Sequence, residues 1–84
     1  MKKVKMYTLS YCPWCMKTKE FFRENKIPFE FVDYDLVSEE EQEKIQDEIQ
    51  KLGGDGGFPF VIIDRSVIQG YNPEEYAKAL GLKK

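Results

Sequence analysis

Residues 4–15 read Val4-Lys5-Met6-Tyr7-Thr8-Leu9-Ser10-Tyr11-Cys12-Pro13-Trp14-Cys15. The first six of these residues alternate between two faces, which predicts a β-strand over residues 4–9. Pro13 suits the first position of a helix, where its missing N–H costs no hydrogen bond, and Cys12 then becomes the N-cap residue. The helical pattern continues to about Asn25, so the sequence predicts a strand that leads directly into a helix at the two cysteines.

A second strand is predicted over residues 29–34, where Phe29 and Phe31 alternate with Glu30 and Val32. Strand, helix and strand in this order form a βαβ unit, whose two strands pair in parallel through a right-handed crossover. The first and second strands are therefore expected to lie side by side in one sheet.

A second helix is expected to begin at the capping box formed by Ser38 and Glu41 and to end at a pair of glycines. Its apolar stripe is thin and consists of Ile45, Ile49 and Leu52. The other faces of this helix carry mostly acidic side chains, so one narrow face is expected to pack.

The last third of the chain predicts two strands and a helix. Residues 60–63 form a continuous apolar run, typical of a strand buried on both faces, and residues 67–69 return as its antiparallel partner. Asn72 is expected to cap the last helix. Its buried stripe is expected to consist of Tyr76, Ala79 and Leu80, and the helix is expected to end at Gly81. The order β-α-β-α-β-β-α predicts an α/β fold in one domain, residues 1–84, with a four-stranded mixed sheet and helices on both faces.

The net charge of −2 is distributed unevenly along the chain. Residues 1–26 carry seven basic residues (Lys or Arg) and two acidic ones. Residues 27–55 carry two basic and ten acidic residues, and residues 56–84 carry four basic and three acidic residues. The basic first segment favours a thiolate and anionic partners, although ordinary solvated helix faces would give the same pattern. No basic stripe with interleaved aromatic residues indicates nucleic-acid binding, and no apolar run has membrane-spanning length. We expect a soluble, cytoplasmic monomer.

Cys12 and Cys15 are the two cysteines of the chain. A disulfide between them would close too small a loop to stabilise the fold much, so a structural role is disfavoured. Unpaired N–H groups and the dipole at a helix N-terminus stabilise an anion on Cys12, whereas Cys15, one turn later, points toward the core. We predict that Cys12 attacks a substrate disulfide and that Cys15 resolves the mixed disulfide, with Pro13 holding the two sulfurs in register.

Metal binding is the alternative reading of the same pair. A tetrahedral zinc site needs four ligands, usually Cys or His, and this sequence has no histidine and no further cysteine. A zinc ion or an iron–sulfur cluster would have to be shared between two subunits or with an external thiol. A third possibility is an interaction module with unreactive thiols.

On the segment from Tyr7 to Cys15, taken together with the rest of the sequence, the chain resembles a dithiol glutaredoxin of the thioredoxin-fold superfamily. The resemblance covers nearly the whole length and includes the loop at Pro59 and the turn at Gly70. It implies a thiol–disulfide oxidoreductase with a cis bond between Phe58 and Pro59, which would place the Phe58 backbone beside the cysteines. The substrate-binding residues that it implies are Tyr11, Pro13, Trp14, Phe58, Pro59, Gly70 and Tyr71. Trp14 stands where the family usually has tyrosine, and we expect it to be exposed as an aromatic contact surface.

Two departures from the family concern the electron donor. Leu9 occupies the position of a lysine that pairs with glutathione, and Gly70-Tyr71 replaces a Gly-Gly sequence. The turn at Gly70 is more similar to that of NrdH-type redoxins, which take electrons from a thioredoxin-type reductase and pass them to ribonucleotide reductase. The resemblance thus implies that no cofactor is tightly bound. It also implies that the partners are disulfide-containing proteins, ribonucleotide reductase among them. It implies glutathione, or a thioredoxin-type or ferredoxin-linked reductase, as the donor.

Overall fold

The computed structural model describes residues 2–82. Along the chain its elements are β1 (Val4–Thr8), α1 (Pro13–Glu24), β2 (Glu30–Asp33), a short 3₁₀ helix η1 (Tyr34–Leu36), α2 (Glu39–Lys51), β3 (Phe60–Ile63), β4 (Ser66–Gln69) and α3 (Pro73–Leu80). The predicted order of strands and helices is confirmed. The 3₁₀ helix after β2 is the one regular element of the described chain that the sequence did not predict.

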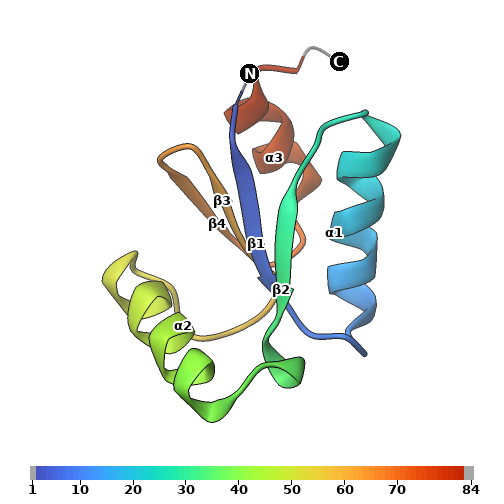
Figure 1. Cartoon of the computed structure of the whole chain (residues 1–84). Helices are drawn as coiled ribbons and strands as arrows, with labels where there is room; N and C mark the ends of the chain where they lie inside the picture. The colour runs from blue at the N-terminus through green and yellow to red at the C-terminus, as the bar shows by residue number, and fades with distance from the viewer. Residues whose placement is uncertain (1, 83–84) are drawn as a thin grey trace.

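The four strands form one sheet in the order β2-β1-β3-β4 (Figure 1). β1 pairs with β2 in parallel, as the βαβ pattern predicts, and β3 is antiparallel to both β1 and β4. β1 therefore lies inside the sheet, between β2 and β3. Its carboxyl end leads into the loop and helix that carry the two cysteines.

Each face of the sheet has its own apolar core. The face covered by α1 and α3 buries Val4, Met6, Phe22, Val61, Ile63, Ile68 and Tyr76. The face covered by α2 buries Tyr7, Ile45, Ile49 and Phe60. The prediction of helices on both faces of a mixed sheet is thus confirmed, and α2 stands apart from the other two helices in Figure 1.

The three predicted N-cap residues all stand at the first ends of their helices, and two of them form the expected side-chain hydrogen bond. The Cys12 sulfur accepts a hydrogen bond from the N–H of Cys15, and the Ser38 side chain accepts one from the N–H of Glu41. Asn72 stands at the N-cap position of α3, as predicted, but its side chain makes no capping hydrogen bond. Its φ of −142° and ψ of 79° differ from the extended values seen at Cys12 and Ser38.

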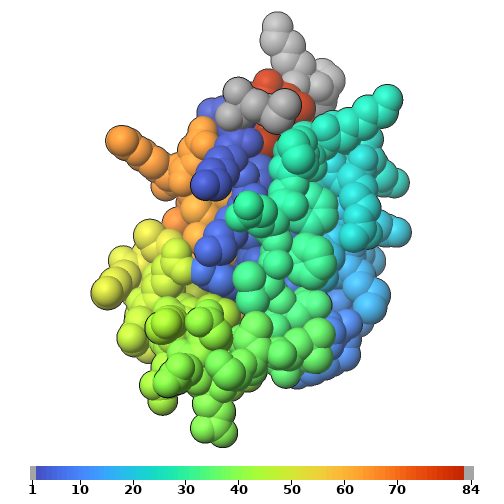
Figure 2. Space-filling view, in the orientation of Figure 1, coloured from blue at the N-terminus to red at the C-terminus, as the bar shows by residue number. Residues whose placement is uncertain are grey.

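Three expectations about strand length and burial need correction. The second strand is shorter than predicted. It is an edge strand, visible in green at the surface of Figure 2, and its Phe31 is 45% exposed. Leu52 lies beyond the last turn of α2 and is exposed. In α3 the residue buried beside Tyr76 is Ala77, whereas Ala79 is only partly buried.

Candidate active site

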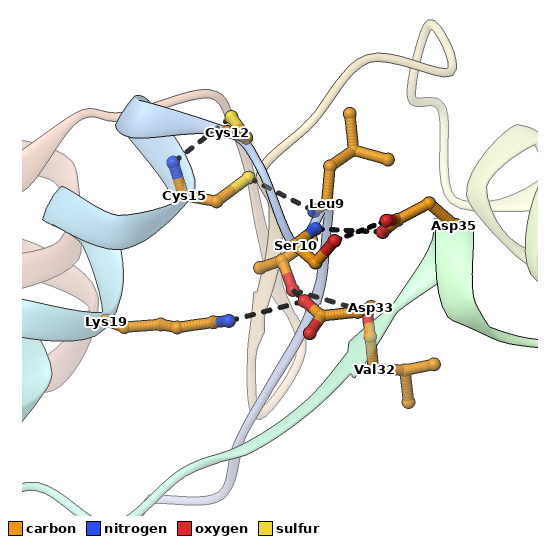
Figure 3. Close-up of polar contacts among 9 residues, drawn as sticks. Leu9, Ser10, Cys12, Cys15, Lys19, Val32, Asp33 and Asp35 are labelled. Carbon is orange, nitrogen blue, oxygen red and sulfur yellow. Dashed lines mark hydrogen bonds and ion pairs between the residues drawn. The ribbon is translucent and has the colours of Figure 1, made fainter.

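The two cysteines lie at the junction of β1 and α1 in unequal surroundings. Cys12 is partly exposed at the N-cap, and its sulfur lies 3.3 Å from the Cys15 nitrogen that donates to it. Cys15 is 0% exposed, and its sulfur accepts a hydrogen bond from the N–H of Leu9 at 3.5 Å. Both thiols are free. One sulfur can therefore meet a partner in solution, while the other is enclosed by the protein. Figure 3 shows both side chains at the start of α1.

Burial raises the pKa of the Cys15 thiol to about 12, and its hydrogen bond with Cys12 acts in the same direction. The N–H of Leu9 and the positive charge of Lys19 oppose this rise. Cys15 is therefore a neutral thiol at neutral pH. It becomes a nucleophile only when something stabilises its thiolate.

Two carboxylates, Asp33 at the end of β2 and Asp35 in η1, lie against the segment that carries the cysteines (Figure 3). Asp33 accepts a hydrogen bond from the Thr8 hydroxyl at 2.6 Å and pairs with the Lys19 ammonium at 3.3 Å. Asp35 accepts hydrogen bonds from both the N–H, at 2.8 Å, and the hydroxyl of Ser10. These bonds lower the pKa of Asp35.

Sequence reasoning did not identify Asp33 and Asp35 as part of the site. A signal for them was present, because the carboxyl ends of neighbouring parallel strands meet at the same edge of a sheet. Thr8 and Asp33 are paired residues in the register of β1 and β2. A side chain that ends β2 is thereby placed beside the loop that follows β1.

Trp14 is 55% exposed, as predicted, and lies one residue before Cys15. Its ring stacks on Tyr71 at 5.7 Å between centroids, and the Lys17 ammonium lies 4.9 Å from the ring centre. Tyr11, on the other side of Cys12 in the chain, is 69% exposed. The structure thus joins two of the predicted substrate-binding residues, Trp14 and Tyr71, in one aromatic surface; that they bind substrate stays a prediction.

The bond between Phe58 and Pro59 is cis, as the family resemblance implied. The carbonyl of Pro59 accepts a hydrogen bond from the N–H of Gly70 at 2.8 Å, so these two predicted residues are also joined. The Tyr76 hydroxyl in turn donates to the Gly70 carbonyl. The Phe58 ring packs on Tyr34 at 5.1 Å between centroids, on the side of the sheet covered by α2.

Residues 2–82 contain neither a metal-binding cluster nor a helix suited to span a membrane. No cluster of three or more His, Cys, Asp or Glu side chains in this part of the chain could hold a metal ion. None of the helices described there is long and apolar enough to cross a membrane.

Residues 4–68 match the family model of glutaredoxin. A glutaredoxin-like 8.6 kDa protein in the rubredoxin operon of Clostridium pasteurianum is 32% identical over 92% of this chain and 96% of its own length. The crystal structure of Methanosarcina acetivorans methanoredoxin is similar with a TM-score of 0.87 and 34% identity, over 95% of this chain and 85% of the other. Escherichia coli NrdH-redoxin, at 21% identity over 90% of this chain and 92% of its own, shares the fold with a TM-score of 0.75. With the family model matched over most of its length, the chain belongs to the glutaredoxin family.

Proposed function

We propose that this protein is a thiol–disulfide oxidoreductase that cycles Cys12 and Cys15 between dithiol and disulfide. The observation that carries the proposal is the difference between the two sulfurs, one partly exposed at a helix N-terminus and the other fully buried. Reactive cysteines need access to solvent and a surrounding that favours the thiolate. Membership of the glutaredoxin family supports the same chemistry.

The proposed cycle has two exchange steps. The Cys12 thiolate attacks a substrate disulfide, forms a mixed disulfide and releases one substrate thiol. The Cys15 thiol then loses its proton and attacks the Cys12 sulfur, and the second substrate thiolate leaves and takes up a proton. The two electrons that reduce the substrate are those lost when Cys12 and Cys15 become a disulfide.

We further propose that glutathione is a weak donor and that a thioredoxin-type or ferredoxin-linked reductase reduces the disulfide. Glutathione carries free carboxylates, and the family position that pairs with one of them holds the apolar Leu9. The Gly70-Tyr71 sequence likewise lacks the second glycine of glutathione-binding members, and the Tyr71 ring is occupied by stacking on Trp14. Dithiols of this kind persist reduced in the cytoplasm, where we place the protein.

A coupled assay with insulin disulfides as substrate tests the donor. Turnover driven by NADPH and a thioredoxin-type reductase should exceed turnover driven by NADPH, glutathione reductase and glutathione. Leu9→Lys should raise the glutathione-driven kcat/KM two- to fivefold, which corresponds to an exposed ion pair of about 0.4–1 kcal/mol, whereas the matched Leu9→Met should not. Efficient turnover with glutathione and none with the reductase would overturn the donor assignment.

A further inference from the structure

The resolving step requires a charge at a place that water does not reach. Cys15 is completely buried, and a thiolate taken out of water is costly unless a positive charge or hydrogen bonds compensate it. The N–H of Leu9 supplies one hydrogen bond at 3.5 Å. A cation held close to the sulfur would supply the rest.

Lys19 meets this requirement. It lies four residues after Cys15, and residues four apart are neighbours on the same helix face. Figure 3 shows both side chains extending from α1 toward the strands. The Lys19 side chain is only 13% exposed, and its ammonium lies 3.9 Å from the centre of the Phe31 ring. It is therefore packed inside the molecule and does not extend into solvent as most lysines do.

Asp33 fixes the position of this ammonium. Its carboxylate, on a side chain that is 17% exposed, pairs with Lys19 at 3.3 Å and accepts the Thr8 hydroxyl at 2.6 Å. Thr8 is the last residue of β1, and the next residue, Leu9, donates its N–H to the Cys15 sulfur. The same end of β1 thus carries both the hydroxyl that binds the carboxylate paired with Lys19 and, one residue later, the N–H that binds the Cys15 sulfur.

Resting on the proposed dithiol mechanism, we propose that Lys19 and Asp33 are positioning residues for the resolving step. The Lys19 ammonium, oriented by Asp33 and Thr8, stabilises the Cys15 thiolate while it attacks the mixed disulfide on Cys12. In that step a bond forms between the two cysteine sulfurs, and the bond between Cys12 and the substrate sulfur breaks. The proton lost by Cys15 balances the proton gained by the leaving thiolate, and no outside oxidant is needed.

The other titratable groups around Cys15 do not supply this positive charge. Cys12 on α1 raises the pKa of Cys15 by its hydrogen bond and its charge. Tyr76 faces it from α3 as a buried phenol whose own pKa is raised, first by burial and in smaller part by Cys15. Asp33 ends β2, and Asp35, in η1, is likewise a carboxylate that interacts with Lys19. Lys19 is the cation that lowers the pKa of Cys15.

One stopped-flow trace separates the two steps. The reduced protein is mixed with dithiobis(nitrobenzoic acid), which releases one coloured thiol when Cys12 attacks and a second when Cys15 resolves. In Lys19→Met the pKa of Cys15 should rise, because the charge that stabilises its thiolate is gone. At a pH below the pKa of Cys15, each unit by which this pKa rises lowers the thiolate fraction tenfold. The second phase should therefore slow about tenfold, and the plot of its rate against pH should shift by about one unit to higher pH. The first phase should keep its rate.

Three further variants make the test specific. Lys19→Arg retains the charge and should restore the second phase to within about threefold of the wild type. Lys78→Met removes the same charge from an exposed site on α3 and should leave both phases unchanged. Removing Lys19 alone leaves Asp33 unpaired and could unfold the protein. The double variant Lys19→Met with Asp33→Asn leaves no unpaired charge and should show the same slow second phase.

The outcomes separate this inference from the proposed function. If the wild type releases two thiols, and the double variant resolves at the wild-type rate with the wild-type pH dependence, the role of Lys19 is wrong and the dithiol mechanism stands. If the wild type releases only one thiol, the dithiol mechanism itself is wrong, and the inference falls with it.

Discussion

Replacing Cys12 by serine is expected to abolish the reduction of protein disulfides, with a loss of roughly a thousandfold or more. The serine hydroxyl stays protonated at neutral pH and is a poor nucleophile toward sulfur. Cys15 cannot take over, because it is 0% exposed and burial keeps its thiol neutral with a pKa of about 12. The measurement is the initial rate of insulin reduction at equal protein concentration.

The control for this variant is Met16→Leu. Met16 follows Cys15 in α1 and is exposed, so this substitution changes a neighbouring side chain without touching either sulfur. It should keep the wild-type rate. If a folded Cys12→Ser protein retains a tenth or more of the wild-type rate, Cys12 is not the nucleophile.

The largest loss of stability is expected for Phe22→Ala. The Phe22 side chain is completely buried on the inner face of α1, with the rings of Phe21, Phe29 and Tyr76 at 5.3 to 5.9 Å between centroids. Truncating such a residue removes its transfer free energy and leaves a cavity, which costs about 3–5 kcal/mol. Because the total free energy of unfolding of a small domain is only about 5–15 kcal/mol, this substitution should remove a large part of the protein's stability.

Urea unfolding measures this loss as a drop in the transition midpoint with an unchanged slope. Leu36→Ala is the matched control, because it also truncates a large apolar residue, but one that is 70% exposed in η1. It should change the free energy of unfolding by no more than about 0.5 kcal/mol. A loss below 1 kcal/mol for Phe22→Ala would contradict the core described for this face of the sheet.

The parts of the fold that sequence predicted well are those encoded locally. Pro13 after a potential N-cap marks the start of α1, and the capping box at Ser38 marks the start of α2. The apolar run over residues 60–63 identifies a strand covered on both faces, and β3 is such a strand. Periodicity and caps act within a few residues, so they can be read from the chain directly.

The errors concern properties that depend on distant residues. The second strand is shorter than predicted and lies at the edge of the sheet, and strand order is a tertiary property. Leu52 fits the helical stripe of α2 by spacing, but the helix has already ended when the chain reaches it. Asn72 occupies the predicted N-cap position, but its side chain makes no capping hydrogen bond there.

In the candidate site, too, some features could be predicted from the local sequence and others depend on the tertiary structure. The cysteine pair and its place at a strand–helix junction follow from the sequence alone. The partnership of Lys19 with Asp33, and of Ser10 with Asp35, depends on the register between β1 and β2. A residue on α1 and one at the end of β2 become partners only after the sheet has formed.

The most direct test of the central claim is to find which sulfur receives the substrate. The Cys15→Ser variant, in which the mixed disulfide cannot be resolved, is incubated with an oxidised peptide disulfide, and the adduct is mapped by mass spectrometry without reducing agent. We predict one stable adduct per chain, located on Cys12, that a dithiol reductant releases. A chain that acquires no adduct, while the Cys12→Ser variant acquires one on Cys15, would contradict the assignment of nucleophile and resolving thiol.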